Sequence, residues 1–361
     1  MAARSLWGRF RASFHNRIAP MQNFMAEPPE AAKPLLQAQG NIAEALERIV
    51  SNRPHQAFVD AALHALKPQA APAVTHNVLD LIGENSQLHA DLLQAHEAHQ
   101  AGRLPGLPTG IPALDELLRG LRPGLTLVGA VPGAGKTALA LNVAIQTARD
   151  GGRVLFLTAD ESPERLALKA VCIAGGLKIS NFADGWRHPG ELLATLESRP
   201  WLANIEFVGG HRLNFDALAS KAEGAALVVA DYVQALAVIA GGTLEMRHAV
   251  DALATQLRDI ATRCRVPVLA LSSLNRAGYE EPTLAALRES GGLEFTADVV
   301  ALLNCANPGD DVRELRLRVE KNRFGKAFVD VELGFEPAFL AFRERPAFSP
   351  PPMRQVFSNR K

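Results

Sequence analysis

The sequence has 361 residues, enough for more than one domain, because a single hydrophobic core rarely serves more than about 250–300 residues. Its 38 basic and 38 acidic residues balance, which neither favours nor excludes a nucleic-acid partner, and no run of about 18 apolar residues is present that would predict a membrane span. Three cysteines without CxxC spacing predict neither a zinc module nor a disulfide framework, and they indicate a cytoplasmic protein.

The first segment, residues 1–26, stands apart because arginines alternate there with large apolar residues and no acidic residue precedes Glu27. Such a pattern can be a transit peptide or a membrane-surface helix. We favour a disordered basic arm, or a translation start at Met21 or Met25, and we expect no membrane partner.

Residues 27–103 are predicted to form a helical N-terminal region and linker. Apolar residues recur there at helical spacing, and a Pro/Ala-rich stretch, Lys67–Val74, interrupts them. A further helix is expected over Asn85–His99, with leucines along one face. Its three histidines have no cluster of carboxylates or cysteines beside them, so they predict no metal site.

Residues 104–345 have a different sequence pattern, in which short apolar runs alternate with segments of helical periodicity. The runs predict buried, mainly parallel strands over Leu125–Ala130, Val154–Thr158, Ile205–Val208, Leu227–Ala230, Val266–Leu271 and Val299–Leu303. Helices are predicted over Thr137–Arg149, Pro163–Ala174 and Arg247–Cys264. This alternation predicts an α/β fold built from βαβ units.

The end of this region alternates apolar and polar residues. Glu314–Glu320 and Ala327–Phe335 therefore predict a β-hairpin added to the edge of the sheet. A Pro-rich, basic tail is expected over residues 346–361.

The strongest chemical signal is a phosphate-binding loop between a predicted strand and a predicted helix. It consists of Ala130, Val131, Pro132, Gly133, Ala134, Gly135, Lys136 and Thr137. Its glycines let backbone N–H groups surround phosphate oxygens, Lys136 can reach the β- and γ-phosphates, and Thr137 can ligate Mg²⁺. Ala130 replaces the usual first glycine, which is acceptable where φ is not positive. The loop predicts binding of ATP with Mg²⁺.

Acidic residues follow two of the predicted strands. Asp231 ends one of them and is expected to hold Mg²⁺ through water beside the phosphate loop. Asp160 and Glu161 follow another strand, where either carboxylate can position the attacking water. These acids can also cap the next helix together with Ser162, and both roles can hold at once.

Further blocks, in the same order, resemble the motor domain of the DnaB family of replicative helicases. They are Gly106–Asp115 with Gly120–Gly124, Asp231–Gln234, Leu271–Arg276, Leu287–Glu294 with Ala297–Asp298, and Lys321–Arg323. The resemblance covers about two-thirds of the chain. The related RadA branch is similar over Asp160–Pro163 and Lys321–Gly325, but its four-cysteine zinc module is missing, which favours DnaB.

The resemblance implies a RecA-like P-loop core in a homo-oligomeric ring, a hexamer, with ATP between neighbouring subunits. Lys321 and Arg323 would then reach the γ-phosphate of the adjacent subunit and stabilise the charge of phosphoryl transfer. Single-stranded DNA, and replication proteins such as a primase or a loader, are the implied partners. On sequence alone, two solvated charges on an exposed hairpin are a reasonable alternative, and the family resemblance favours the role across the subunit interface.

Several positions depart from the family pattern. Asp160 stands where the family has its catalytic glutamate, which is one methylene longer, so Glu161 is the alternative base. Ser273 replaces a glutamine that links γ-phosphate sensing to the DNA loop. That loop is short and acidic here, which predicts weak neutralisation of DNA phosphates. The candidate DNA contacts, which can equally be ordinary surface arginines, are Arg247, Arg276 and Arg288.

The first hypothesis is an ATP-driven DNA helicase or translocase that works as a hexamer around single-stranded DNA. The second is a nucleotide-dependent ring-forming assembly or scaffold ATPase with slow turnover and no unwinding, which the departures favour. A third is a RadA- or KaiC-like ATPase in recombination or regulation. ATP binding follows from the residues themselves, whereas unwinding follows from the resemblance.

Overall fold

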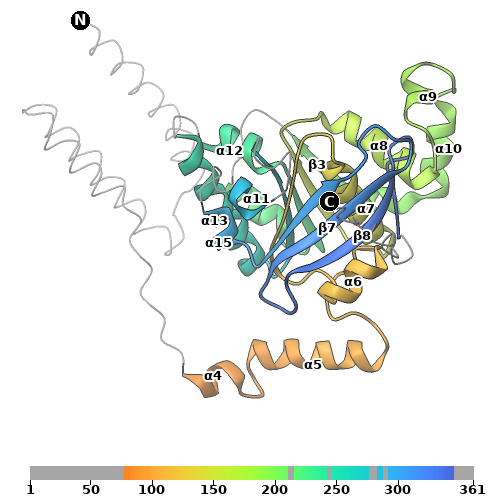
Figure 1. Cartoon of the computed structure of the whole chain (residues 1–361). Coiled ribbons are helices and arrows are strands. Elements are labelled where there is room, and N and C mark those ends of the chain that lie inside the picture. Colours follow the sequence, from red (N-terminus) through yellow and green to blue (C-terminus); the bar gives the residue numbers. More distant parts are fainter. Residues whose placement is uncertain (1–76, 210–214, 242–244, 276–282, 288–291, 345–361) are drawn as a thin grey trace, which may run out of the picture. The chain divides into compact units, whose positions relative to one another are not determined.

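The computed structural model describes residues 77–209, 215–241, 245–275, 283–287 and 292–344 (Figure 1). The chain divides into two compact units, Met1–Asn77 and Val78–Lys361, and the described residues fall almost entirely in the second. The predicted basic arm, the helices and linker before Asn77 and the Pro-rich tail lie outside the described residues. The helix expected over Asn85–His99 is confirmed as α5, Gln87–Gln100, after the short α4, Val78–Ile82.

A nine-stranded sheet forms the centre of the described part, in the order β3-β2-β4-β5-β1-β6-β7-β8-β9. Strands β1 to β6 are parallel to one another, whereas β7, β8 and β9 are antiparallel to their neighbours. The bounds are β1 Gly124–Ala130, β2 Val154–Thr158, β3 Ile205–Gly209, β4 Leu227–Asp231, β5 Pro267–Ser273, β6 Val299–Cys305, β7 Arg313–Asn322, β8 Val329–Glu336 and β9 Ala341–Glu344. The predicted parallel core and hairpin are therefore confirmed.

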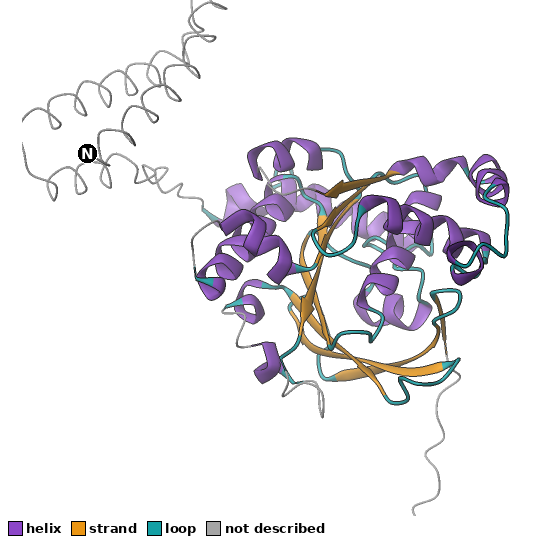
Figure 2. Cartoon of the chain, turned by 90° about the horizontal axis from the view of Figure 1, so that it is seen from above, coloured by secondary structure: helices purple, strands orange, loops and turns teal. Residues whose placement is uncertain are grey.

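Helices cover the sheet on both faces, so that it lies between two helical layers (Figure 2). One buried apolar cluster joins the sheet to α6 Pro112–Leu118, α7 Lys136–Arg149 and α8 Pro163–Gly175. The other joins the opposite face to α11 Phe215–Ala222, α12 Val233–Gly241 and α13 Met246–Arg263. The remaining described helices are α9 Ser180–Ala183, α10 Gly190–Ser198, the 3₁₀ helix η2 Pro200–Asn204, α14 Leu284–Leu287 and α15 Leu293–Thr296.

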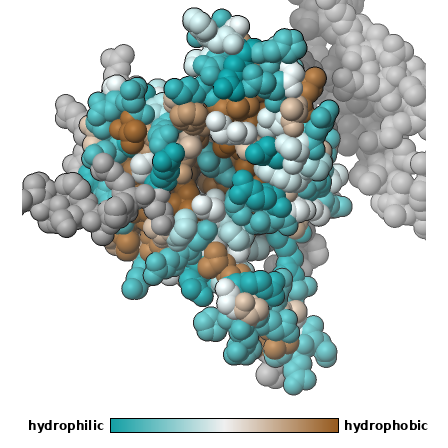
Figure 3. All heavy atoms as spheres, turned by 90° about the vertical axis from the view of Figure 1, so that its right-hand side faces the viewer, coloured by the Kyte–Doolittle hydropathy of each residue, from teal (hydrophilic) through white to brown (hydrophobic). Residues whose placement is uncertain are grey.

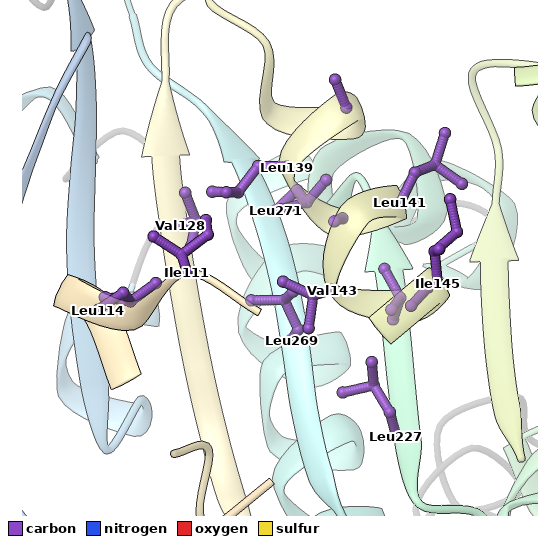
Figure 4. Packing of buried hydrophobic residues seen from close by; sticks show 14 of the residues in the cluster. Ile111, Leu114, Val128, Leu139, Leu141, Val143, Ile145, Leu227, Leu269 and Leu271 are labelled. Atoms are coloured by element: carbon purple, nitrogen blue, oxygen red, sulfur yellow. The ribbon is translucent and has the colours of Figure 1, made fainter. Parts of the chain in front are cut away.

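Helix α7 follows the phosphate loop and is held firmly against the sheet. Leu139 and Val143 of α7 face Leu269 and Leu271 of β5 in the core (Figure 4). All four side chains are at most 3% exposed, and burying a side chain of this size contributes roughly 1.5–3 kcal/mol. This packing fixes the N-terminal end of α7, and therefore the phosphate loop, against the sheet.

The Gly106–Asp115 segment, which precedes β1, is held in its conformation by one buried carboxylate. Asp115 accepts hydrogen bonds from the backbone N–H groups of Thr109 at 2.7 Å and Gly110 at 3.2 Å. Gly106 passes Gly120 so closely that an added Cβ would lie 2.7 Å from a Gly120 backbone carbon. These contacts explain why the segment carries glycines and an aspartate at fixed positions.

The sequence analysis did not predict β9, which adds a further strand beyond the predicted hairpin. Its four residues are too few to show an alternating pattern in the sequence. Packing between strands stabilises β9 instead, because the ring centroids of Phe342 and Phe335 lie 4.7 Å apart. Among the described residues, no helix is long and apolar enough to span a bilayer. The face in Figure 3 is mostly hydrophilic, with smaller hydrophobic patches.

Candidate nucleotide-binding site

The phosphate loop joins the end of β1 to the start of α7. It turns at Gly133 and Gly135, whose φ angles are 79° and 99°, and Gly135 is the residue before the helix. Such angles suit glycine and let successive N–H groups converge on an anion at the positive end of the helix dipole. Ala130 is fully buried and has no positive φ, so the alanine at the first position is accommodated as expected.

Lys136 lies folded over this loop. Its ammonium donates to the carbonyl oxygens of Ala130 at 3.1 Å and Val131 at 3.2 Å. Burial lowers the pKa of Lys136, while the nearby carboxylates of Asp231 and Asp160 oppose that shift. A cation held between carbonyls and partly desolvated is well placed to exchange these contacts for phosphate oxygens.

A cleft of about 440 Å³ opens over the loop, and we call it the P-loop cleft. Its lining brings together residues that are far apart in the sequence, from Pro132 to Leu340. They are Pro132, Gly133, Gly135, Lys136, Thr137, Ala138, Asp160, Glu161, Lys169, Asp231, Tyr232, Ser273, Arg313, Phe335, Pro337 and Leu340. The structure therefore gathers the predicted loop lysine and threonine and all three predicted acids in one cavity.

Asp231 is the most perturbed of these groups. It ends β4 and is only 3% exposed. Burial raises the pKa of Asp231 to about 6, against the opposing hydrogen bond from Thr137 and the charge of Lys136, and with further upward contributions from Asp160 and Glu161. A carboxylate paired with a threonine hydroxyl beside a phosphate loop supplies the hard oxygen ligands that Mg²⁺ prefers.

The neighbouring acids Asp160 and Glu161 differ in their surroundings. Glu161 forms an ion pair with Lys169, and its other carboxylate oxygen is buried without a hydrogen-bond partner. Its carbonyl also accepts a 2.6 Å hydrogen bond from Thr158 Oγ1. Asp160 is exposed, and its charge acts on Lys136 and on Tyr232. Asp160 is therefore the carboxylate that is open to water.

Ser162 caps the N-terminus of α8, which was the alternative role considered for Asp160, Glu161 and Ser162. The Ser162 hydroxyl accepts a hydrogen bond from Arg165 N at 3.4 Å at the start of α8.

The sequence analysis missed the part of the cleft that comes from the C-terminal strands. Arg313 opens β7, and its guanidinium donates to the Gly133 carbonyl at 3.0 Å. Phe335, Pro337 and Leu340 line the same side. The alternating pattern of β7 and β8 signals strands, but it carries no information on which strand end meets the phosphate loop. That meeting follows from the order β1-β6-β7.

Lys321 and Arg323 lie away from the P-loop cleft of their own chain. Arg323 N donates to the Asp298 carbonyl, and Asp298 N donates to the Leu125 carbonyl, so Arg323 is level with the start of β1. Five residues of strand separate Leu125 from Ala130, which is about 17 Å. The Lys321 ammonium donates to the carbonyls of Glu294, Phe295 and Ala297 at 2.8, 3.2 and 2.7 Å.

The remaining predicted residues are spread over other elements. Ser273 lines the cleft, and Gln234 holds its backbone, accepting from Ser273 N at 3.1 Å and donating to Ser273 O at 3.0 Å. Arg247 is exposed near the start of α13. Arg276 and Arg288, with the whole acidic segment 277–282, lie outside the described residues.

Comparison with known proteins yields one family and several relatives. The family described as the DnaB-like helicase C-terminal domain matches residues 106–344. The replicative DNA helicase DnaB of Geobacillus stearothermophilus is 29% identical over 217 residues, which cover 56% of this chain and 48% of that protein. The chain thus spans about half the length of that relative.

Two solved structures share the fold. The ATPase domain of G40P superposes with a TM-score of 0.62 at 22% identity, covering 73% of this chain and all of that one. A DnaB-like replicative helicase, whose structure was determined together with its interactions with primase, gives a TM-score of 0.61 at 22% identity, covering 86% of this chain and 75% of that chain.

Proposed function

This chain belongs to the family of DnaB-like helicase C-terminal domains, and on that basis we propose that it is an ATP-driven DNA helicase or translocase that acts on single-stranded DNA as a homo-oligomeric ring. One observation carries the proposal most directly. The P-loop cleft brings together the phosphate loop, the Thr137 and Asp231 oxygens that suit Mg²⁺, and the exposed Asp160 carboxylate. The two cations proposed to stabilise charge on the phosphate, Lys321 and Arg323, lie about 17 Å away along the sheet.

The cleft suits ATP. The triphosphate would lie on the N–H groups around Gly133 and Gly135, with Lys136 released from its two carbonyls toward the β- and γ-phosphates. The apolar side formed by Phe335 and Leu340 suits a flat base, and the Arg313 guanidinium suits the base or a phosphate oxygen.

The pair formed by Thr137 and Asp231 fits Mg²⁺. The hydroxyl and the carboxylate are hydrogen-bonded to each other, so their oxygens lie side by side next to the loop. A bound Mg²⁺ supplies charge neutralisation of the phosphoryl oxygens. Burial raises the pKa of Asp231, and the charge of a bound cation would lower it again, so cation binding would favour loss of the Asp231 proton.

Asp160 is the proposed general base or water-positioning residue. It is exposed in the cleft, whereas one Glu161 oxygen is engaged by Lys169 and the other is buried. A base must be free to accept a hydrogen bond from the attacking water, and a carboxylate held in an ion pair is a weaker acceptor. Glu161 then acts through its contact with Lys169, which holds the cleft wall together.

Lys321 and Arg323 are proposed to complete the site of a neighbouring subunit. The antiparallel direction of β7 places Arg313 at the chain's own phosphate loop and Arg323 at the far end of the strand. A side chain about 7 Å long cannot bridge about 17 Å of strand. The hairpin cations would therefore act on the phosphate of another copy, and we propose that the copies are arranged head to tail in a ring, a hexamer by resemblance to the family.

Single-stranded DNA in the pore is the proposed track, with Arg247, Arg276 and Arg288 as candidate contacts. The DnaB-like helicase with 22% identity was solved with its interactions with primase, so we also propose primase as a partner class, together with a loader.

A subunit-mixing experiment tests the proposal. Lys136→Ala removes the phosphate-loop lysine and Arg323→Ala removes the hairpin cation, so each variant alone is expected to hydrolyse ATP poorly. Mixed rings contain interfaces with an intact loop on one side and an intact Arg323 on the other. At equal amounts these are about a quarter of all interfaces, which sets the largest expected recovery of wild-type hydrolysis. Arg316→Gln, an exposed arginine of the same strand, is the matched control and should be active alone.

Stimulation by single-stranded DNA separates motor from scaffold. Hydrolysis that rises with DNA, together with recovery on mixing, supports the motor. ATP binding with negligible turnover that ignores DNA would contradict it. That result would favour a nucleotide-gated assembly protein, a candidate supported by the short Asp160 side chain and by Ser273, whose backbone is clamped by Gln234.

A further inference from the structure

Asp298 is a buried carboxylate at the start of β6 and has no role in the reaction proposed above. Its side chain is 9% exposed. One carboxylate oxygen accepts a hydrogen bond from Leu125 N at 2.9 Å, where β1 begins. Backbone bonds reinforce the site, because Asp298 N donates to Leu125 O at 2.8 Å and Asp298 O accepts from Arg323 N at 3.0 Å. Asp298 thus joins the central strand to the end of the β7 strand.

The second oxygen of Asp298 is shared by two arginines. Arg323 Nη1 donates to it at 3.1 Å, and Arg258 Nη2 from α13 lies at 3.1 Å from the same oxygen. Arg258 is anchored in turn by a hydrogen bond to the Thr296 carbonyl. Two positive charges on one buried carboxylate leave a net positive charge at this place, which suits a group that must attract an anion.

The guanidinium of Arg323 is held by hydrogen bonds but still has unused N–H donors. Besides its bond to Asp298, Arg323 Nη2 donates to Phe295 O at 3.3 Å. A guanidinium has five N–H donors, so three remain after these two bonds, and the side chain is 46% exposed. Lys321 differs, because its ammonium has three donors and three carbonyl contacts. Arg323 is therefore the hairpin cation with donors to spare.

We propose that Asp298, supported by Arg258, is a positioning residue that orients the Arg323 guanidinium for the phosphate of a neighbouring subunit. This inference rests on the proposed function, since it needs Arg323 to act across a subunit interface. The carboxylate fixes the plane of a group that otherwise rotates freely on a long side chain. Holding a reacting group in place before the reaction lowers the barrier, and a misplacement of about 1 Å can cost up to roughly a hundredfold in rate.

Asp298→Asn isolates the positioning role from the structural one. The asparagine amide oxygen can still accept the hydrogen bond from Leu125 N, while the charge that pairs with both arginines is lost. The expected result is a kcat for ATP hydrolysis about tenfold lower, with KM for ATP within about twofold, because ATP is bound by the P-loop cleft at the other end of the sheet.

A double-mutant cycle with Arg323→Ala supplies the decisive readout. If Asp298 acts through Arg323, then Asp298→Asn has no further effect on kcat once Arg323 is alanine, whereas a merely structural role gives additive losses. Asp330→Asn is the matched control, because Asp330 is a carboxylate on the same hairpin that pairs with Arg316 and Arg318 but not with Arg323. It should leave kcat unchanged.

The outcomes separate this inference from the proposed function. If Arg323→Ala leaves kcat unchanged, the trans role of Arg323 and this inference both fall. If Arg323→Ala lowers kcat but Asp298→Asn does not, or its loss adds in full, only this inference is overturned. Should Asp298→Asn fail to fold, Arg258→Gln replaces it, since that side chain is 35% exposed, and the same absence of additivity is required of it.

Discussion

Asp231→Asn is expected to stabilise the nucleotide-free protein while it abolishes ATP hydrolysis. The wild-type carboxylate is 3% exposed, and its burial raises the pKa to about 6 from the ordinary value of 3.8. An ionised group at such a site opposes folding. Asparagine has nearly the same shape, can still accept a hydrogen bond from Thr137, and carries no charge.

The size and sign of the effect follow from proton linkage. Between about pH 4 and pH 6 the unfolded carboxyl loses its proton while the folded one keeps it, so stability falls as the pH rises. Above pH 6 both are ionised and the full penalty is present. The gap between 3.8 and about 6 corresponds to an upper limit of about 3 kcal/mol. Allowing for relaxation around the site, we expect a gain of about 1–3 kcal/mol at pH 8 for the variant.

Thermal unfolding in EDTA without nucleotide, measured from pH 4.5 to 8, is the assay. Each kcal/mol corresponds to about 2–4 °C in Tm for a chain of this size. The variant should unfold several degrees higher than the wild type at pH 8, and the difference should shrink to about a third of that at pH 4.5, where the folded carboxyl keeps its proton but much of the unfolded one has lost it. An equal or lower Tm at pH 8, or a gain independent of pH, would refute the reasoning. Adding Mg²⁺ with ATP should then stabilise the wild type more than the variant.

Three further predictions follow from the same geometry. Asp160→Asn should lower kcat at least about a hundredfold, whereas Glu161→Gln should lower it by less than about tenfold, because Lys169 already engages Glu161; steady-state hydrolysis measures both. Asp115→Ala should destabilise the protein by about 2–4 kcal/mol, since it leaves the N–H groups of Thr109 and Gly110 without an acceptor; denaturant unfolding measures the loss. Arg313→Ala should raise KM for ATP and leave kcat within a few-fold, because Arg313 binds at the loop and not at the reacting phosphate; nucleotide titration detects it.

Each of these has a control within the chain. Equal losses for the Asp160 and Glu161 variants would contradict the separation of their roles. Asp115→Asn, which keeps one acceptor oxygen, should recover part of the stability lost in Asp115→Ala, and no recovery would point to a different cause. Arg343→Ala is the control for Arg313→Ala, because the Arg343 side chain on β9 is 70% exposed. An equal change in KM for this control would contradict the role of Arg313 in binding ATP at the cleft.

The sequence by itself determined the parts that depend on local pattern. The apolar runs predicted the parallel strands, and the Ala130–Thr137 segment predicted the phosphate loop, because a buried strand, a glycine turn and an amphipathic helix each leave a signature within a few residues. The acids after β2 and β4 were predicted to share one edge of the sheet, since parallel strands end on the same side. All three lie in the P-loop cleft.

Only the tertiary structure decided which of these residues meet and which stay apart. The order β1-β6-β7 and the reversal of direction at β7 bring Arg313 to the phosphate loop and carry Arg323 to the far end of the strand. The added β9 strand and the Asp298 contacts with two arginines depend likewise on strand order and register. Strand order and register arise from packing between segments far apart in the chain, so no window of neighbouring residues contains them.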